Sequence, residues 1–339
     1  TSYPMKQTLK NIFSSNPTNQ QKIYGDSLIS LLESSNLKIV DIGSGNGIGP
    51  GIGNFSQFAS YINYFPCDPT MASNINSEIQ WKSIKYIREG IWTESGTKSL
   101  NIMSQPGLSS LLKPNTSVIS TFNNHADYKI KSTQTIKTIK LNEAAIKYKF
   151  ENADFLSIDT QGSELEILMS GQLLLESSIL GIFIETEFQE LYEGQSLFAD
   201  VDKYLRNLGF ILFDIDRVLM RRQNYSKEYY SRKQISHCHC LYLKPLSLIN
   251  EQNSKSLNNK LEQLLVITMA NEHYDLAREI CSIEPSRYLL FEKHGKSLLD
   301  ELEDYIYFRT QTIKHITRKY NPENELSNPL YKDRKHRYK

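Results

Sequence analysis

Carboxylate side chains end two of the apolar segments in the middle of the chain. Asp159 closes the segment 153–159, and Glu185 and Glu187 share one face near the end of the segment 179–188. Three carboxylates around one crevice repel one another, which raises the pKa of one of them and suits it to act as a base. Alternatively, they hold a divalent cation that binds and acidifies a hydroxyl group. The structural alternative is that they orient loops, with Glu187 capping a helix or pairing with a lysine.

A glycine-rich stretch follows the first apolar segment. The sequence "KIVDIGSGNGIGPGIGNF" places a glycine at every second position from 43 to 53. A glycine turn after a strand lets a ligand approach the bare backbone, and the N terminus of a following helix supplies N–H donors. No lysine lies between positions 39 and 64, which excludes the loop that binds nucleoside triphosphates. No register of the glycines gives the G-x-G-x-x-G/A pattern of a dinucleotide loop.

The pattern that remains, D-x-G-x-G-x-G after a buried strand, is found in Rossmann-like enzymes that use S-adenosylmethionine. Asp41 at the strand end is then expected to meet the ammonium group of the ligand, directly or through water. Asp68 lies about 20 residues further on, where a carboxylate can bind both ribose hydroxyls; a solvated turn residue is the alternative. Trp92 is a candidate to flank the adenine, or else a core aromatic residue. The candidate cofactor-binding residues are Asp41, Gly43, Ser44, Gly45, Asn46, Gly47, Asp68 and Trp92.

The elements that position these residues are short apolar segments that alternate with helical patterns. This alternation predicts an α/β fold, a Rossmann-like seven-stranded and mainly parallel sheet with helices on both faces. The segment 93–150 interrupts the alternation and is expected to form extra strands, as a hairpin outside the main sheet. Strands are expected at 38–43, 64–69, 83–92, 153–159, 179–188, 209–215 and 237–244, and helices within 162–175 and 197–208.

Two sequence blocks resemble a known family. The block "DFLSIDTQGSELEIL" carries Asp159, Gln161, Gly162 and Glu164, with Glu164 expected in the first turn of a helix. The later block carries Glu185, Glu187, Phe188, Leu191 and Tyr192, followed by Gly209 and Phe210. Together with the glycine stretch they are similar to the FkbM family of methyltransferases, over about residues 38–244. The resemblance implies O-methylation that depends on S-adenosylmethionine and leaves S-adenosylhomocysteine, often on sugars or other hydroxyl-bearing natural products.

The sequence "HCHC" at positions 237–240 contains residue types that bind metals. Consecutive residues on a strand point alternately to opposite faces, so the four side chains cannot close a tetrahedral site. At best His237 and His239 share a face. No metal site is therefore predicted from this segment, and a divalent cation enters only through the carboxylates described above.

The chain is expected to divide into four regions. Leu28, Leu31 and Leu32 lie at helix spacing ahead of the first strand. After Pro245 the sequence becomes polar and then purely helical, with about three helices expected. The predicted regions are a helical lead-in (1–37), a methyltransferase domain that depends on S-adenosylmethionine (38–245), a C-terminal helical region (255–320) and a flexible basic tail (321–339).

The composition limits the classes of partner. The 339 residues carry a formal net charge of +1, which gives no support to general binding of nucleic acid. No stretch approaches the roughly 20 apolar residues of a membrane span. The four cysteines are few and spread out, and no apolar leader opens the sequence, so a cytoplasmic location is expected. The expected partner is a small-molecule or glycan acceptor, and the basic tail is more simply explained as a solvated end.

Two other functions stay open beside methyl transfer. The first is a protein that keeps this fold without catalysis and uses its C-terminal helices as a contact surface. The presence of Asp41, Gly43, Gly45, Asp68 and Asp159 argues against it. The second is a nicotinamide-dependent enzyme, which the glycine registers disfavour.

Overall fold

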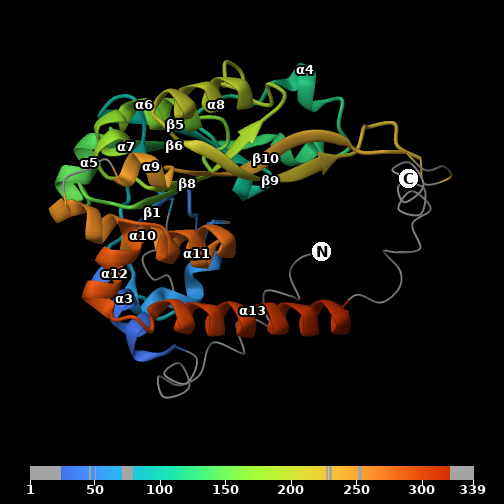
Figure 1. Cartoon of the computed structure of the whole chain (residues 1–339). Helices are drawn as coiled ribbons and strands as arrows, with labels where there is room; N and C mark the ends of the chain where they lie inside the picture. Colours follow the sequence, from blue (N-terminus) through green and yellow to red (C-terminus); the bar gives the residue numbers. More distant parts are fainter. Residues whose placement is uncertain are drawn as a thin grey trace. The chain divides into compact units, whose positions relative to one another are not determined.

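The computed structural model describes seven ranges of the chain and groups them into two compact units. The larger unit comprises residues 32–273, and the smaller unit combines residues from 1–31 and 274–339. Figure 1 shows the whole chain coloured along the sequence. The residues described are 24–45, 47–49, 51–70, 79–226, 228, 231–250 and 254–320.

A seven-stranded sheet organises the larger unit, in the order β3-β2-β1-β7-β8-β10-β9. All pairings from β3 to β8 are parallel, whereas β10 is antiparallel to both β8 and β9. The predicted seven-stranded, mainly parallel sheet is confirmed. Its strands are β1 (Lys38–Ile42), β2 (Asn63–Cys67), β3 (Ser83–Ile84), β7 (Phe155–Ile158), β8 (Gly181–Glu187), β9 (Ile211–Met220) and β10 (Gln234–Leu243).

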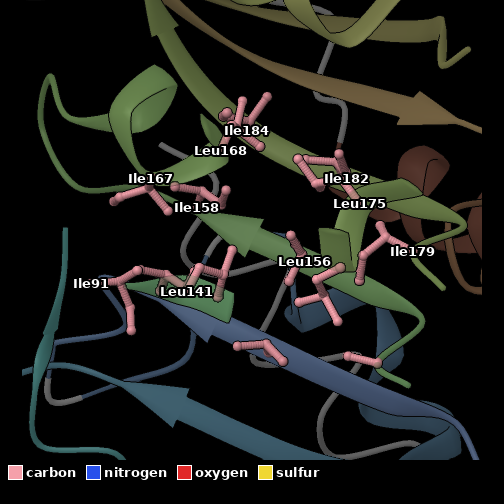
Figure 2. Packing of buried hydrophobic residues seen from close by; sticks show 14 of the residues in the cluster. Ile91, Leu141, Leu156, Ile158, Ile167, Leu168, Leu175, Ile179, Ile182 and Ile184 are labelled. Atoms are coloured by element: carbon pink, nitrogen blue, oxygen red, sulfur yellow. The ribbon is translucent and has the colours of Figure 1, made fainter. Parts of the chain in front are cut away.

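Helices cover both faces of this sheet, as predicted. Leu156 and Ile158 of β7 pack with Leu168 of α6 (Glu164–Ser170) and Leu175 of α7 (Gln172–Ser177) in one buried cluster (Figure 2). Burying each such side chain contributes roughly 1.5–3 kcal/mol. The preceding Phe155 points to the opposite face, where its ring lies 4.8 Å from that of Phe55. Phe55 belongs to the 3-10 helix η1 (Gly53–Tyr61). The larger unit also contains α5 (Leu141–Tyr148), α8 (Phe198–Asn207) and, after β10, α9 (Leu246–Asn250).

The order of the strands reverses between β1 and β7. The chain runs from β1 outward through β2 to β3, and returns to β7 on the other side of β1. In open α/β sheets the ligand crevice lies beyond the carboxyl ends of the strands at such a reversal. The glycine stretch follows β1 and Asp159 follows β7, so both lie at this point.

A separate three-stranded sheet accounts for the segment that breaks the alternation. Its order is β4-β6-β5, and β5 (Gly96–Met103) pairs antiparallel with β6 (Ile130–Ile139). The expected extra strands are therefore confirmed. The short helices between them are η2 (Pro106–Leu108), α4 (Thr116–Ile119) and η3 (His125–Tyr128).

The prediction of one strand over 83–92 is wrong. Ser83–Ile84 pairs with β2 in the main sheet, whereas β4 (Gly90–Ile91) pairs with β6 in the small sheet. Between them Ile87 is the one residue that is buried. The polar side chains around it have no core to face, and the chain therefore leaves one sheet for the other.

The described residues 254–320 form four helices, where about three were expected. On α10 (Ser254–Ala270) the leucines from Leu257 to Leu265 are buried. Gly295 has φ +96° and follows α12 (Ser286–His294). The other two helices are α11 (Tyr274–Ser282) and α13 (Leu298–Tyr320). None of the helices in the described ranges combines the length and the apolar character that crossing a bilayer requires.

The smaller unit is helical. It contains α11, α12 and α13, together with the first turns of α3 (Asp26–Ser35), the helix of the predicted lead-in. The ring of Tyr305 on α13 lies 5.9 Å from that of Tyr24 and 6.2 Å from that of Tyr274. Glu301 accepts a hydrogen bond of 2.8 Å from the backbone N–H of Leu28. The rest of the lead-in and the predicted basic tail lie outside the described residues.

Candidate active site

The loops that follow β1 and β7 are in contact where the strand order reverses. The backbone N–H of Asp159 donates to the carbonyl oxygen of Ile42 at 3.0 Å. Gly43 has φ +85°, and a Cβ at this position would lie 1.9 Å from the carbonyl oxygen of Asp159. Since no other side chain fits there, Gly43 is what lets the two loops meet. The contact fixes Asp159 beside the glycine stretch.

At Gly45 and Gly47 no described side chain covers the backbone of the loop. Gly45 has φ +58°, and a Cβ on Gly45 or Gly47 would meet no described atom within 4 Å. Gly51 differs, because a Cβ there would lie 2.5 Å from the ring of Phe183 on β8. The glycine stretch therefore serves two purposes. Gly43 and Gly51 permit packing, whereas Gly45 and Gly47 expose backbone beside space that no described residue fills.

Asp68 lies against this open backbone. It follows β2 directly, and its Oδ2 accepts a hydrogen bond of 2.9 Å from the N–H of Gly45. Its Oδ1 accepts from the backbone N–H and the hydroxyl of Thr70, at 2.7 and 2.6 Å. The structure thus brings Asp68 to the glycine stretch, and its binding of a ribose stays a prediction.

Asp41 is used inside the protein. Its Oδ2 accepts from the N–H of Gly49 at 3.0 Å and from the hydroxyl of Tyr64 at 2.6 Å. Its side chain is 1% exposed, and this burial raises the pKa of the carboxyl group above its usual range. Asp41 therefore stabilises the glycine stretch through its hydrogen bond to Gly49. Its contact with a ligand stays a prediction.

The remaining predicted cofactor residues are placed differently from one another. The hydroxyl oxygen of Ser44 is buried and has no hydrogen-bond partner among the described residues, so it is free to bind a ligand. Trp92 follows β4 of the small sheet, where Lys98 Nζ lies 5.8 Å from the centre of its ring. Asn46 lies outside the described residues.

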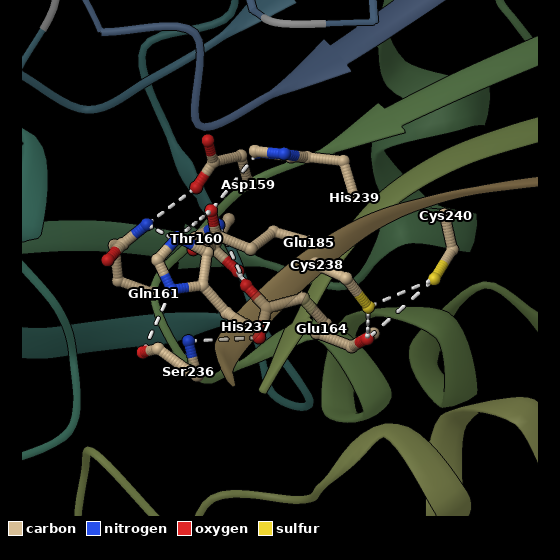
Figure 3. A network of polar contacts seen from close by, with 12 residues as sticks. Asp159, Thr160, Gln161, Glu164, Glu185, Ser236, His237, Cys238, His239 and Cys240 are labelled. Carbon is tan, nitrogen blue, oxygen red and sulfur yellow. Dashed lines mark hydrogen bonds and ion pairs between the residues drawn. The ribbon is translucent and has the colours of Figure 1, made fainter. Parts of the chain in front are cut away.

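The carboxylates of Asp159 and Glu185 are joined by one amide. Gln161 Nε2 donates to Asp159 Oδ1 and to Glu185 Oε1, both at 2.7 Å (Figure 3). The hydroxyl of Tyr192 donates to the carbonyl oxygen of Leu108 at 2.8 Å and lies 3.3 Å from Gln161 Oε1. Gln161 and Tyr192 were part of the family resemblance but not of the predicted catalytic set. The contacts of Gln161 show that it positions the two carboxylates.

Two histidines complete the cluster, and the sequence did not predict them as site residues. In the antiparallel pairing of β10 with β8, His239 lies opposite Glu185 and His237 opposite Glu187. Glu185 Oε2 lies 3.2 Å from His239 Nε2 and 3.6 Å from His237 Nε2. The expectation that the two histidines share a face is confirmed. Cys238 and Cys240 point to the other face, where their sulfur atoms are 3.3 Å apart.

The cluster holds groups with opposite pKa shifts. Burial alone would raise the pKa of Glu185, but the hydrogen bond from His239 and the charges of both histidines lower it below its usual value. Burial lowers the pKa of His239, but the interaction with Glu185 outweighs it and raises the pKa above its usual value. Burial and the negative charge of Glu185 raise the pKa of Asp159 well above its usual range. Glu185 and His239 thus form an ion pair beside a carboxyl group with a raised pKa.

Glu164 secures the turn between β7 and α6. Its Oε1 accepts from the N–H and the hydroxyl of Thr160 at 2.8 and 2.9 Å, and its Oε2 accepts from the N–H of Gly162 at 2.9 Å. It begins α6, as predicted. Burial raises the pKa of Glu164 to about 7, with a further contribution from the charge of Glu185.

Glu187 is buried with an unused oxygen. Its side chain is 1% exposed, and its Oε2 has no hydrogen-bond partner among the described residues. The expected alternatives, a helix cap or a lysine pair, do not occur within those residues. Burial, followed by the charges of Glu164 and Glu185, raises the pKa of Glu187 well above its usual range.

Among the solved structures that resemble this chain, three share 10–13% sequence identity with it and have TM-scores of 0.23–0.28. An uncharacterized protein from Listeria monocytogenes serotype 4b has 13% identity and a TM-score of 0.28, with 85% of this chain and 99% of that chain covered. A proposed RNA methyltransferase from Pyrococcus horikoshii has 10% identity and a TM-score of 0.28, with coverage of 73% and 98%. A tRNA methyltransferase from B. subtilis has 10% identity and a TM-score of 0.23, with coverage of 82% and 97%.

A protein-family model matches the middle of the chain. No curated protein matches the sequence. Residues 48–212 match the model described as "Methyltransferase FkbM domain". The matched range contains Asp68, Asp159, Glu185 and Glu187. The resemblance is confirmed over residues 48–212, which match the FkbM methyltransferase domain.

Proposed function

We propose that this protein transfers a methyl group from S-adenosylmethionine to a hydroxyl group of a sugar, glycan or related natural product. The observation that carries the proposal is the contact between Gly43 and the backbone of Asp159. It brings the backbone of Asp159, whose carboxyl group is half-buried, against the loop whose backbone is open at Gly45 and Gly47. A cofactor on that backbone and an acceptor at Asp159 would therefore be neighbours.

The residues present fit this cofactor. S-adenosylmethionine has no pyrophosphate, and the open backbone at Gly45 and Gly47 leaves room for its amino acid and ribose. Asp68 at the end of β2 is the carboxylate for the ribose hydroxyls. The unpartnered hydroxyl of Ser44 adds one hydrogen-bonding group. When bound, the cofactor supplies an electrophilic methyl group on a good leaving group.

Asp159 is the carboxyl group that would receive the proton of the acceptor hydroxyl. Glu185 and Glu187 are buried at 5% and 1% exposure, whereas Asp159 is half-buried. Its raised pKa makes its ionised form a stronger base than an ordinary carboxylate. In the overall reaction the acceptor oxygen loses a proton and gains the methyl group. Gln161 would hold the carboxylate in position through its hydrogen bond to Oδ1.

The choice of a hydroxyl acceptor rests on this base and on the family resemblance. Methyl transfer to oxygen needs a base because a neutral hydroxyl is a weak nucleophile. A carboxylate near the methyl donor satisfies that requirement. The resemblance to the FkbM family favours sugars and similar natural products as the source of the hydroxyl.

Calorimetric titration with S-adenosylhomocysteine and, separately, with NAD tests the proposal. We expect S-adenosylhomocysteine to bind and NAD not to bind. In the Asp68→Asn variant the dissociation constant for S-adenosylhomocysteine should rise about tenfold or more, equivalent to about 1.4 kcal/mol. The exposed Asp214→Asn variant on β9 is the matched control and should bind as the wild type does. If neither ligand binds, the protein is the interaction module, and if only NAD binds, it is a nicotinamide enzyme.

A further inference from the structure

The side chains of Asp159, Glu185 and His239 meet at the edge of the candidate active site. We propose that they bind a divalent transition-metal cation. One ligand atom from each residue can be chosen so that all three lie within 4.8 Å of one another. Figure 3 shows the three side chains converging. The residues come from the loop after β7, from β8 and from β10, so the arrangement depends on the folded sheet.

The hydrogen bonds from Gln161 use one oxygen of each carboxylate and leave the other oxygen of each available to bind a cation. Gln161 Nε2 binds Asp159 Oδ1 and Glu185 Oε1. Glu185 Oε2 remains, 3.2 Å from His239 Nε2, and Asp159 Oδ2 remains as the second carboxylate oxygen. A cation bound to these three atoms would replace the proton between Glu185 and His239. Gln161 would keep orienting both carboxylates, as the outer partners of metal ligands commonly do.

The histidine ring is also held in place. It stacks on the ring of Phe183, with centroids 5.6 Å apart and planes 16° apart. Phe183 and Glu185 lie two positions apart on β8, and His239 is directly opposite Glu185 in the neighbouring strand. The plane of the imidazole and the direction of its Nε2 are therefore set by the sheet. A ligand fixed in this way loses little conformational entropy on binding a metal.

A second observation points to a positive charge at this place. Glu187 Oε2 is buried without a hydrogen-bond partner among the described residues, on the same face of β8 as Glu185. With Asp159 and Glu164, this gives four carboxyl groups on adjoining elements against His237 and His239. A buried carboxylate oxygen without a donor is costly unless a cation or a proton is near. A bound cation satisfies that need.

The ligand set indicates which cations fit. Two carboxylate oxygens and one imidazole nitrogen suit Zn²⁺, Mn²⁺, Fe²⁺ or Co²⁺, whereas Mg²⁺ and Ca²⁺ prefer oxygen alone. Three protein ligands leave a position open for a further oxygen. If the proposed function holds, that oxygen is the hydroxyl of the acceptor, which the cation would bind and make more acidic; with Asp159 as a cation ligand, the proton of the hydroxyl would pass to water. This last step rests on the proposed function, and the metal site itself does not.

The test is titration of the full-length protein with Mn²⁺ alone, followed by electron paramagnetic resonance, and with Zn²⁺ alone, followed by calorimetry. We expect one bound cation per chain. The His239→Ala and Asp159→Asn variants should each weaken binding about 100-fold. The exposed His125→Ala variant, which removes a histidine outside the cluster, should bind as the wild type does. Circular dichroism checks that each variant is folded, and the second ligand variant keeps the test valid if the first does not fold.

The outcomes separate this inference from the proposed function. Asp68→Asn should lose affinity for S-adenosylhomocysteine and keep its affinity for Mn²⁺. A wild-type protein that binds S-adenosylhomocysteine but neither cation overturns the metal site alone. A protein that binds a cation but not S-adenosylhomocysteine overturns the proposed function alone. Unchanged cation binding in folded His239→Ala and Asp159→Asn variants would also overturn the metal site.

Discussion

The α-carbon of Gly43 and the carbonyl oxygen of Asp159 approach so closely that a Cβ on residue 43 would lie 1.9 Å from that oxygen. This contact joins the loop that follows β1 to the loop that follows β7. Any shift of the glycine stretch would therefore move the carboxyl group of Asp159 as well. This backbone contact, rather than a contact between flexible side chains, therefore sets the distance between the loop of the proposed cofactor site and the residue proposed as the base.

Replacing Gly43 by alanine should destabilise the protein by more than about 2 kcal/mol, because both the left-handed backbone and the contact with Asp159 exclude a side chain. The measurement is urea unfolding followed by circular dichroism. Gly53→Ala is the matched control, since a Cβ there would meet no described atom within 4 Å and its φ is not in the left-handed region. Its free energy of unfolding should change by less than about 0.5 kcal/mol. Equal stabilities of the two variants would contradict this explanation of the contact.

Removing the hydroxyl of Tyr64 should also destabilise the protein, because this hydroxyl binds Asp41, which in turn binds the glycine stretch. In the Tyr64→Phe variant Asp41 Oδ2 loses a buried hydrogen bond of 2.6 Å, and we expect a loss of about 1–3 kcal/mol in the free energy of unfolding. Tyr288→Phe, at an exposed tyrosine of α12, is the control and should unfold like the wild type. A Tyr64→Phe variant as stable as the wild type would show that this hydrogen bond does not support Asp41.

The stability of the protein should depend on pH through Glu164. Its pKa is raised to about 7 in the folded state, against an ordinary value of 4.5, so the folded state holds its proton more tightly than the unfolded state does. Such a group stabilises the fold fully below pH 4.5, and this contribution is lost as the pH rises through 7. The Glu164→Gln variant cannot ionise. Its free energy of unfolding, relative to that of the wild type, should therefore rise between pH 5 and pH 8.

Urea unfolding at a series of pH values measures this difference. The exposed Glu143→Gln variant controls for the loss of one acidic side chain. A difference between Glu164→Gln and wild type that stays constant, or that falls with rising pH, would rule out the raised pKa as a determinant of stability. The hydrogen bonds of Glu164 to Thr160 and Gly162 add a constant loss in the variant that does not alter the slope.

Replacing Asp159 by asparagine should lower the rate of methyl transfer about 10²–10⁴-fold, because the amide cannot accept the proton of the acceptor. The affinity for S-adenosylhomocysteine should stay within about twofold, since Asp68 and the open glycine backbone remain. The measurement is transfer of tritium from labelled S-adenosylmethionine to glycans and to hydroxyl-bearing small molecules. Asp214→Asn again serves as the control. A variant that keeps the full rate would exclude Asp159 as the base.

Much of the fold could be predicted because short apolar segments and turn residues mark its strands locally in the sequence. Asp41 and Glu187 lie in short apolar strands, and Asp159 directly follows another. Short apolar runs bounded by turn residues are all that a buried parallel strand needs. The prediction failed at 83–92, where two short strands join different sheets. Which sheet a two-residue strand joins depends on distant partners, here Asn63–Tyr64 and Thr138–Ile139, and no local pattern records them.

The candidate site was predictable in part for the same reason. Asp159 and the glycine stretch follow strands directly, and Glu185 and Glu187 lie at the end of β8, so the sequence pattern was enough to predict them as candidates. His239 was missed because its place depends on the register of β10 against β8, two strands about 50 residues apart in the chain. The alternation in "HCHC" predicted that the two histidines share a face, but it did not predict that they contact Glu185. The use of Asp41 by Gly49 and Tyr64 likewise depends on how the loop folds back on the sheet.

A crystal structure of the protein grown with S-adenosylhomocysteine would test the proposed site most directly. We expect the amino acid part of the ligand beside Gly45 and Gly47, the ribose hydroxyls at Asp68, and the sulfur atom on the side of Asp159. A ligand bound elsewhere, or a space beside Gly45 and Gly47 that the protein's own side chains fill, would contradict the proposed function.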